Sequence, residues 1–303
     1  MKQLANMTKT TLYSVLALGL VCGSGPAFAQ APPAPAPAQA PAEPPAPTFT
    51  ALGENYHVEF QAGAMMTVPS TAMFADTEDV TTTTNGTSTT TTVTGTNLDF
   101  KSLLGLQNTT VPEVHVTIRL VGKHKVRGEF IPLYYKQTVS SLASNFNFNG
   151  QTYLAGQTVE STLRWSMWNF AYEFDPIVTD RSYVGVVVAV SSLNVGGATA
   201  NTAQSGTASV SILMPGLGGT GRYYVSSKLS ITGDLLVFDL PGGSASTHGR
   251  MIEAGGYAMY SVTKHIGVQA GFRLLDETHG WSSPVNTGQM TVGGPFIGGT
   301  AHF

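Results

Sequence analysis

Apolar and polar side chains alternate one by one along a stretch near the middle of the chain. In its first arm Val114, Val116, Ile118 and Leu120 share one face, and the other face carries His115, Thr117 and Arg119. A second arm repeats the alternation, with Val126, Gly128, Phe130 and Tyr134 opposite Arg127 and Glu129. A side-chain period of two is typical of β-strands. The stretch therefore predicts two antiparallel strands joined by a turn at 122–125.

The same alternation recurs along the rest of the chain. It predicts ten strands, which cover about 56–66, 114–121, 126–135, 159–174, 184–190, 208–214, 223–234, 252–262, 266–274 and 292–303. Within 159–174 the apolar positions change phase after Met167, which we interpret as a β-bulge near 167–168. Residues 98–106 are left open as an additional strand. In the threonine tract at 81–92, Asn85-Gly86 favours a short hairpin.

The expected connections alternate strictly between long and short. The long ones are 67–113, 139–157, 195–206, 235–249 and 276–291, and the short ones are 122–125, 175–180, 215–221 and 263–264. This alternation places both chain ends on the short-turn side, as in outer-membrane barrels with long outer loops and short periplasmic turns. An immunoglobulin-like sandwich has no reason to produce it. We therefore predict an all-β, closed antiparallel transmembrane barrel of about ten strands, with eight to twelve possible.

Composition supports this class because charged residues are only 11% of the chain. Soluble domains carry roughly 25%. After the first 29 residues, no segment approaches the ~20 apolar residues of a membrane helix. Alternation hides the hydrophobicity of a barrel in such a sequence, because every second residue is polar.

The first 53 residues have a composition unlike that of the predicted barrel, 54–303. Residues 1–29 fit a signal peptide, with Lys2 and Lys9, a short apolar run and Ala27-Phe28-Ala29 before the expected cleavage site. Cys22 offers a lipoprotein reading, which Val21 disfavours. Residues 30–53 form a Pro/Ala-rich periplasmic linker. Cleavage would leave 13 basic and 18 acidic residues, a net charge of −5, which argues against nucleic-acid binding.

The end of the chain resembles the bacterial outer-membrane β-barrel family, in the general manner of small OmpA- or porin-like barrels. Gly294-Pro-Phe-Ile-Gly-Gly-Thr-Ala-His-Phe303 is similar to the closing strand of that family, and Phe303 matches its terminal aromatic residue. The resemblance implies location in the bacterial outer membrane, contact with its lipid, and recognition of Phe303 by the barrel assembly machinery. Ala301 and Gly299 depart from the larger apolar residues common in such strands.

If the apolar phase faces lipid, the opposite phase gathers charges inside the barrel. The predicted lumen charge network contains Glu59, Arg119, Arg127, Glu129, Glu160, Arg164, Lys228, Asp234, Glu253 and Arg273. An Arg or Lys facing lipid near the midplane costs about 2–4 kcal/mol, so ten such residues cannot all face outward. We expect them to pair with one another, either filling the lumen or leaving a thin aqueous path.

Three functions remain open from the sequence. The first is a non-enzymatic structural or surface-interaction protein with a side-chain-filled lumen, acting through its long loops on an unknown ligand. The second is a narrow pore for ions or small solutes. The third is a rim hydrolase, for which the candidate outer-loop residues are Asp76, Glu78, Asp79, His248, Asp276, Glu277 and His279. No Gly-x-Ser-x-Gly motif, cofactor motif or metal-ligand spacing is present.

Overall fold

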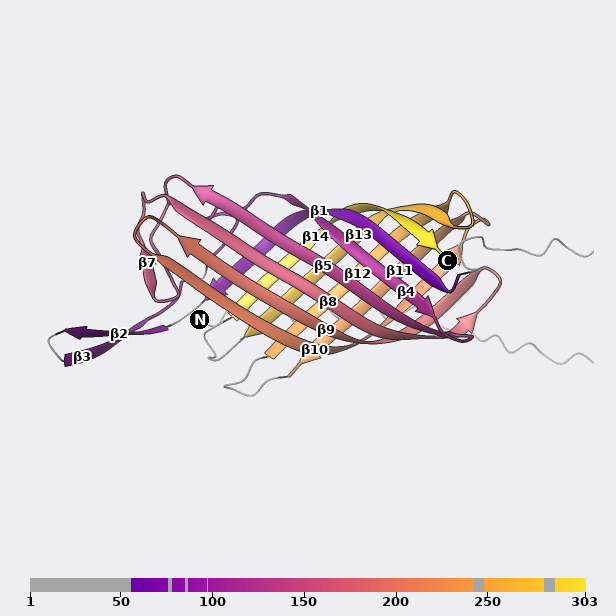
Figure 1. The fold of residues 1–303 in the computed structure, drawn as a ribbon, viewed down its shortest axis with the longest axis horizontal. Coiled ribbons are helices and arrows are strands. Elements are labelled where there is room, and N and C mark those ends of the chain that lie inside the picture. Colours follow the sequence, from indigo (N-terminus) through magenta and orange to yellow (C-terminus); the bar gives the residue numbers. More distant parts are fainter. Residues whose placement is uncertain (1–55, 76–77, 85–86, 97, 242–247, 281–286) are drawn as a thin grey trace, which may run out of the picture. The chain divides into compact units, whose positions relative to one another are not determined.

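The barrel is closed by ten antiparallel strands. The computed structural model describes residues 56–303 apart from 76–77, 85–86, 97, 242–247 and 281–286. The predicted signal peptide and linker lie outside the described residues. Around the barrel the strand order is β1-β14-β13-β12-β11-β10-β9-β8-β5-β4, and β1 pairs with both β14 and β4 (Figure 1). The predicted fold class is therefore confirmed.

Nine of the barrel strands are longer than the alternation predicts, whereas β11 has the predicted length but begins six residues later than the predicted strand 223–234. The barrel strands are β1 (Val58–Ala75), β4 (Thr109–Arg119), β5 (His124–Val139), β8 (Val159–Val178), β9 (Ser182–Ala200), β10 (Ser205–Tyr224), β11 (Leu229–Leu240), β12 (His248–Ser261), β13 (Ile266–Gly280) and β14 (Thr287–His302). In Figure 1, β5, β8, β9 and β10 run side by side at a common tilt. A transmembrane strand needs only about 9–11 residues. The longest strands, of 20 residues in β8 and β10, therefore exceed a membrane's thickness.

Two short hairpins lie between barrel strands in the sequence. The threonine tract forms β2 (Glu78–Thr84) and β3 (Thr87–Val93), which pair as the sequence favoured, although the expected turn, Asn85-Gly86, lies outside the described residues. A second hairpin, β6 (Phe146–Phe148) and β7 (Gln151–Tyr153), was not predicted. Residues 98–106 do not form a strand. Their side chains Leu98, Phe100, Leu104 and Leu106 are instead buried.

We call the end of the barrel with the turns 120–123, 179–181, 225–228 and 262–265 the turn end, and the opposite end the loop end. β1 begins and β14 ends at the turn end. There the backbone amides of His57 and Val58 donate to the carbonyl oxygen of Phe303. The loop end holds the connections 76–108, 140–158, 201–204, 241–247 and 281–286. Connections at the loop end are thus mostly the longer ones.

Two predicted connections are wrong. The expected turn at 215–221 lies inside β10, and the chain turns at 225–228 instead. The expected long loop at 195–206 is a connection of residues 201–204 only. None of the glycines between 215 and 221 has a positive φ. Gly216 and Gly218 face inward, where neighbouring atoms lie too close to leave room for a side chain. A Cβ on Gly216 would lie 2.3 Å from the Phe238 ring, and a Cβ on Gly218 would lie 2.1 Å from the Leu235 carbonyl oxygen.

The expected bulge in β8 is also wrong. Both neighbours pair with β8 in unbroken register across the proposed site, with Met167 opposite Ile131 and Leu193, and Trp168 opposite Phe130 and Ser192. The apolar positions change phase because the environment changes, while the backbone continues regularly. The register shift in β8 lies near the turn end, between Phe174 and Ile177.

The two faces of β8 exchange polarity at one level. Nearer the turn end, Trp168, Phe170, Tyr172 and Phe174 face outward and are exposed, while the inward side carries Asn169, Glu173 and Asp175. Nearer the loop end, the inward side carries Leu163, Trp165 and Met167, and the outward side carries Glu160 and Arg164. We call these parts of the barrel the lower zone and the upper zone.

Neighbouring strands make the same exchange. On β9 the outward residues change from Val184–Val190 to Ser192 and Asn194, and on β10 they change from Leu217 and Leu213 to Ser211 and Ser209. The inward residues of the upper zone form an apolar upper core, which includes Met65, Ile131, Leu133, Trp165, Met167, Leu193, Val195, Ile212, Met214, Phe238, Met251, Leu275, Met290 and Val292. The lower zone thus has the polarity of a membrane barrel, and the upper zone that of a water-soluble barrel.

The outward apolar residues of the lower zone form a continuous belt. Its members include Phe60, Ile118, Val126, Phe170, Tyr172, Val184, Val186, Val188, Leu217, Ile231, Leu235, Val268, Phe272, Leu274 and Ile297. An exposed apolar surface of this extent marks contact with a partner or a membrane. Among the described residues, no helix is both long enough and apolar enough to cross a membrane.

A charge placed in the belt should destabilise the barrel. Val188 is 56% exposed on β9, and Val188→Lys should lower the free energy of unfolding by about 2–4 kcal/mol in lipid vesicles, because an ammonium would face hydrocarbon. Urea titration of the vesicle-folded protein measures this change. The control Ser209→Lys adds the same charge to the outward face of β10 in the upper zone. Equal losses in both variants would contradict the zone assignment.

Candidate functional site

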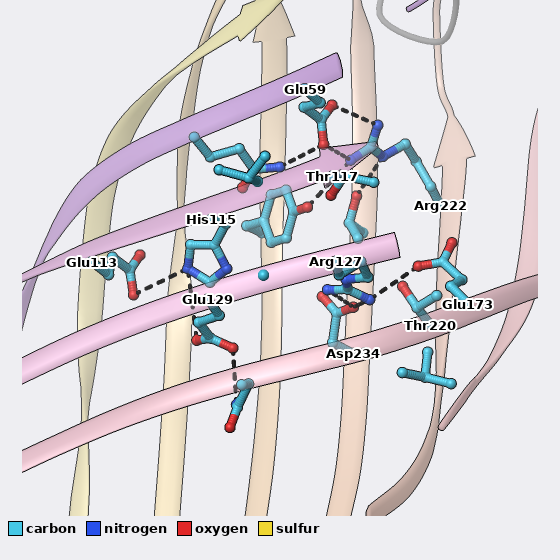
Figure 2. Close-up of a pocket in the computed structure, with 18 of the residues that line it drawn as sticks. Glu59, Glu113, His115, Thr117, Arg127, Glu129, Glu173, Thr220, Arg222 and Asp234 are labelled. Atoms are coloured by element: carbon cyan, nitrogen blue, oxygen red, sulfur yellow. Dashed lines mark hydrogen bonds and ion pairs between the residues drawn. The ribbon is translucent and has the colours of Figure 1, made fainter. Parts of the chain in front are cut away.

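The inward face of the lower zone is a charged lumen. Among the described residues, its acidic side chains are Glu59, Glu113, Glu129, Glu173, Asp175, Asp234 and Glu253, and its basic side chains are Arg119, Lys125, Arg127, Arg222 and Arg273. The cavity left between them is small, with about 40 Å³ open to water-sized molecules. Figure 2 shows Glu59, Glu113, Arg127, Glu129, Glu173, Arg222 and Asp234 among them, which converge from opposite walls of the barrel.

Arg273 on β13 joins three carboxylates from three other strands. Its guanidinium contacts Glu113 at 3.3 Å, Glu253 at 3.5 Å, and Glu129 in a closer pair. Asn169 Nδ2 donates to Glu129 at 3.1 Å and to Glu253 at 3.0 Å, bridging the same carboxylates. The His115 ring nitrogen Nε2 lies 3.2 Å from Arg273 Nη1. This cluster holds more negative than positive groups, so each carboxylate depends on shared donors.

A second cluster is built around Arg127 and Lys125 on β5. Arg127 donates to Asp234 and to Glu173, each at 3.2 Å, and Figure 2 shows its guanidinium between them. Lys125 Nζ lies 2.8 Å from Glu173, 2.9 Å from Asp175 and 3.6 Å from the centre of the Tyr183 ring. A buried ammonium is therefore stabilised by two carboxylates and one aromatic face.

A third cluster lies near the turn end. Arg222 on β10 contacts Glu59 on β1 at 3.3 Å and donates to Thr232 at 3.0 Å. The His302 ring contacts Glu59 at 2.8 Å and stacks on Tyr56 at 5.2 Å. Arg119 lies over the same Tyr56 ring, with its guanidinium carbon 4.8 Å from the ring centre. Ion pairs thus cross the lumen at every level of the lower zone.

The structure brings together seven of the ten predicted lumen charges. These are Glu59, Arg119, Arg127, Glu129, Asp234, Glu253 and Arg273. Glu160 and Arg164 do not belong to them, because they face outward in the upper zone, where Glu160 pairs with Lys136 at 2.9 Å and Arg164 lies 5.3 Å from the Tyr134 ring centre. Lys228 is exposed in the turn 225–228.

Five lumen charges were not predicted: Glu113, Lys125, Glu173, Asp175 and Arg222. Glu113, Glu173 and Asp175 continue the polar phase of their own strands, so extending that phase could have found them. Lys125 was assigned to a turn, and Arg222 followed the segment mistaken for one. Strand ends misjudged by a few residues account for four of these omissions. Glu173 lies inside the predicted strand 159–174, on its polar phase after Met167.

The upper core closes the barrel above the charged lumen. Two loop segments from the loop end add their aromatic side chains to it. A Cβ on the inward Gly197 would lie 3.4 Å from Phe148 and 3.7 Å from Phe100, so both rings pack against the inner wall. Tyr153 Oη donates to the Thr199 carbonyl at 2.8 Å and fixes the β6-β7 hairpin there. Buried and mostly apolar side chains therefore occupy the inside of the barrel above the charged lumen.

Among the candidate hydrolytic residues whose side chains the structure describes, Asp276 lies on the opposite face of β13 from Glu277 and His279. On β13, Asp276 and Thr278 face outward, whereas Glu277 and His279 face inward and are 1% exposed. Trp165 donates to Glu277, which also contacts His279. Asp76 lies outside the described residues, as do the side chains of Glu78 and Asp79. Acid–base hydrolysis needs such groups around a shared water, and the buried pair is enclosed by the upper core.

No metal site is formed in the part of the chain that the structure describes, where no group of three or more His, Cys, Asp or Glu side chains is arranged to hold an ion. The polar groups of the lumen bond to one another.

Comparison with solved structures finds bacterial outer-membrane barrels. The fold is similar to the outer membrane protease OmpT from Escherichia coli, with 9% identity and a TM-score of 0.43 over 81% of this chain and 96% of that one. It is also similar to the toluene transporter TodX from Pseudomonas putida, with 6% identity and a TM-score of 0.31 over 84% and 95%. The CymD monoaromatic hydrocarbon channel gives 7% identity and 0.29 over 83% and 90%.

Similarity at this level concerns the fold alone. No family model matches the chain, and no curated protein matches it.

Loss of Arg273 should destabilise the barrel strongly. Arg273→Met leaves Glu113, Glu129 and Glu253 without their shared cation, which should cost about 3–5 kcal/mol of unfolding free energy. The cost should be smaller at acidic than at neutral pH, because protonation neutralises the stranded carboxylates.

Urea titration in vesicles at both pH values measures this loss. Adding Glu129→Gln and Glu253→Gln to Arg273→Met should recover part of it. The control Arg250→Met removes an exposed arginine from the outer wall and should change stability by less than about 0.5 kcal/mol. A loss that ignores pH would contradict the charge argument.

Proposed function

We propose that the protein is a bacterial outer-membrane β-barrel with a non-enzymatic, structural or surface-interaction role and a lumen closed to solutes. The observation that carries this proposal is the upper core, which fills the barrel above the charged lumen. The apolar belt supports insertion of the lower zone in a membrane. The upper zone then stands outside the membrane as a rigid support for the loops.

The form of the upper zone favours an interaction role. Its outer wall is rich in Ser, Thr, Asn and Gly on β9 and β10, and therefore meets water. Loop segments packed on a rigid barrel keep a defined shape, and binding residues often lie on loops supported in this way. The side chains of these loops would determine which surface ligand binds, whether a small molecule, a polymer or a protein.

A narrow pore is the second candidate, favoured by the unfilled space in the lower lumen. For conduction, that space would have to continue through the upper core. The hydrolase is disfavoured because Asp276 faces away from Glu277 and His279, which are buried.

The assembly role of Phe303 remains part of the proposal. Phe303 is 72% exposed at the end of β14, and its backbone bonds to β1 close the barrel seam. An exposed terminal aromatic is accessible to assembly machinery before the seam forms. The signal peptide, the linker and delivery to the outer membrane complete this proposed route.

Planar-bilayer recording tests whether the lumen is closed. The protein should give no steady conductance steps, because the upper core leaves no aqueous path. Arg127→Ala, in the lumen, should remain equally silent, and so should Arg164→Ala on the outer wall. Steps in the unaltered protein that change with Arg127→Ala but not with Arg164→Ala would establish the pore instead.

Epitope insertion tests the orientation of the barrel. A tag between Thr202 and Ala203, at the loop end, should be detected by antibody on intact cells. The matched tag between Ser226 and Ser227, at the turn end, should be detected only after the outer membrane is permeabilised. Both insertions lie in short polar connections, so the barrel itself should tolerate them. The reverse labelling pattern would refute the proposed orientation.

A further inference from the structure

Positive side chains mark all four connections at the turn end. They are Lys123, Arg181, Lys228 and Lys264, and each is exposed. Two exposed histidines lie at the same end: His265 is in the connection 262–265, and His57 precedes the first strand. Among the described residues, the exposed acidic side chain at this end is Asp180. The turns therefore form a ring with an excess of positive charge, which we call the basic rim.

The basic rim borders directly on the apolar belt. Lys123 follows Val121, which is 77% exposed, and Lys264 lies between Val262 and Ile266, which are 52% and 57% exposed. Lys228 and Arg181 likewise follow the exposed Val225 and Val178 within three residues. At about 3.3 Å per residue, each cation lies within roughly 10 Å of hydrocarbon-facing surface. That is the depth of the lipid headgroups when the belt is in a bilayer.

The opposite border of the belt carries no such excess. The charged outward residues of the barrel wall there are Lys136, Arg164 and Arg250, against Glu160, Asp239 and Asp276. Lys136 and Glu160 neutralise each other in an ion pair of 2.9 Å. Among the described wall residues, the surface charge is therefore balanced at the upper border and positive at the lower one.

We propose that the basic rim binds the phosphate groups of anionic phospholipids in the leaflet at the turn end. Lysine and arginine side chains beside a hydrophobic surface extend their charged ends into the headgroup region. There they meet the negative phosphates of both zwitterionic and anionic lipids, and only the anionic lipids carry net charge. This inference rests on the proposed insertion of the belt in a membrane.

Spin-labelled lipids measure the selectivity directly. The full chain is folded into phosphatidylcholine vesicles, and electron paramagnetic resonance compares motionally restricted phosphatidylglycerol with phosphatidylcholine at the protein surface. We expect a preference for phosphatidylglycerol of about threefold to fivefold at low ionic strength, the size expected for one cation near an anionic surface. The preference should fall in 1 M salt, where the Debye length is about 3 Å.

Matched variants assign the preference to the rim. The rim variant Lys123→Gln/Arg181→Gln/Lys228→Gln/Lys264→Gln should lose it. The wall variant Lys136→Gln/Arg164→Gln/Arg250→Gln should retain it, and so should Lys123→Arg/Lys228→Arg/Lys264→Arg, because charge is the recognised property. If the rim variant does not fold, Lys228→Gln alone should lower the preference in part.

The outcomes separate this inference from the proposed function. Failure of the unaltered protein to enter vesicles, judged by flotation and heat-modifiable gel mobility, would overturn the membrane placement itself. Entry without lipid preference, or a preference that survives in the folded rim variant, would overturn only the inference. Equal loss in the rim and wall variants would also overturn it.

Discussion

The structure depends on one constraint, which is that strands such as β8, β9 and β10 pass through two surroundings of opposite polarity. In the lower zone the outside of the barrel is apolar and the inside is charged, and in the upper zone both are reversed. On β8 the inward side chains change from polar at Asn169 to apolar at Met167. The outward side chains change from apolar at Trp168 to charged at Arg164, so both changes occur at about the same level of the barrel. A β-strand presents alternate residues to its two sides, which lets one regular backbone satisfy both surroundings.

Charges in the lower lumen follow from the same constraint. Side chains in a narrow barrel lose much of their water, so each must find a partner across the lumen. Arg273, Arg127 and Arg222 do this by joining carboxylates from strands distant in sequence. Such pairs add little net stability over apolar packing, but breaking one is costly. The ion pairs therefore fix which strands face one another across the lumen. They also form a polar layer directly below the upper core.

Interior packing and surface charge differ between the two ends of the barrel. At the loop end, Phe100 and Phe148 complete a packed apolar interior that supports the loops. The turn end has tight connections, a closed seam at Phe303 and a rim of cations beside the belt. This polarity matches a protein anchored by its lower half that presents its upper half to the surroundings.

Alternation in the sequence was enough to predict the barrel, the number of its strands and the outward apolar phase of the lower zone, because a period of two is local. It also indicated seven of the lumen charges, since they share the polar phase of their strands. It could not determine the level at which that phase reverses. Glu160 and Arg164 share the spacing of a lumen face, and the phase change at Met167 looks the same as a bulge. Only the pairing of β8 with β5 and β9 shows that the backbone is regular there. The tertiary structure decided the rest because inside and outside are properties of the closed sheet, which no single strand carries.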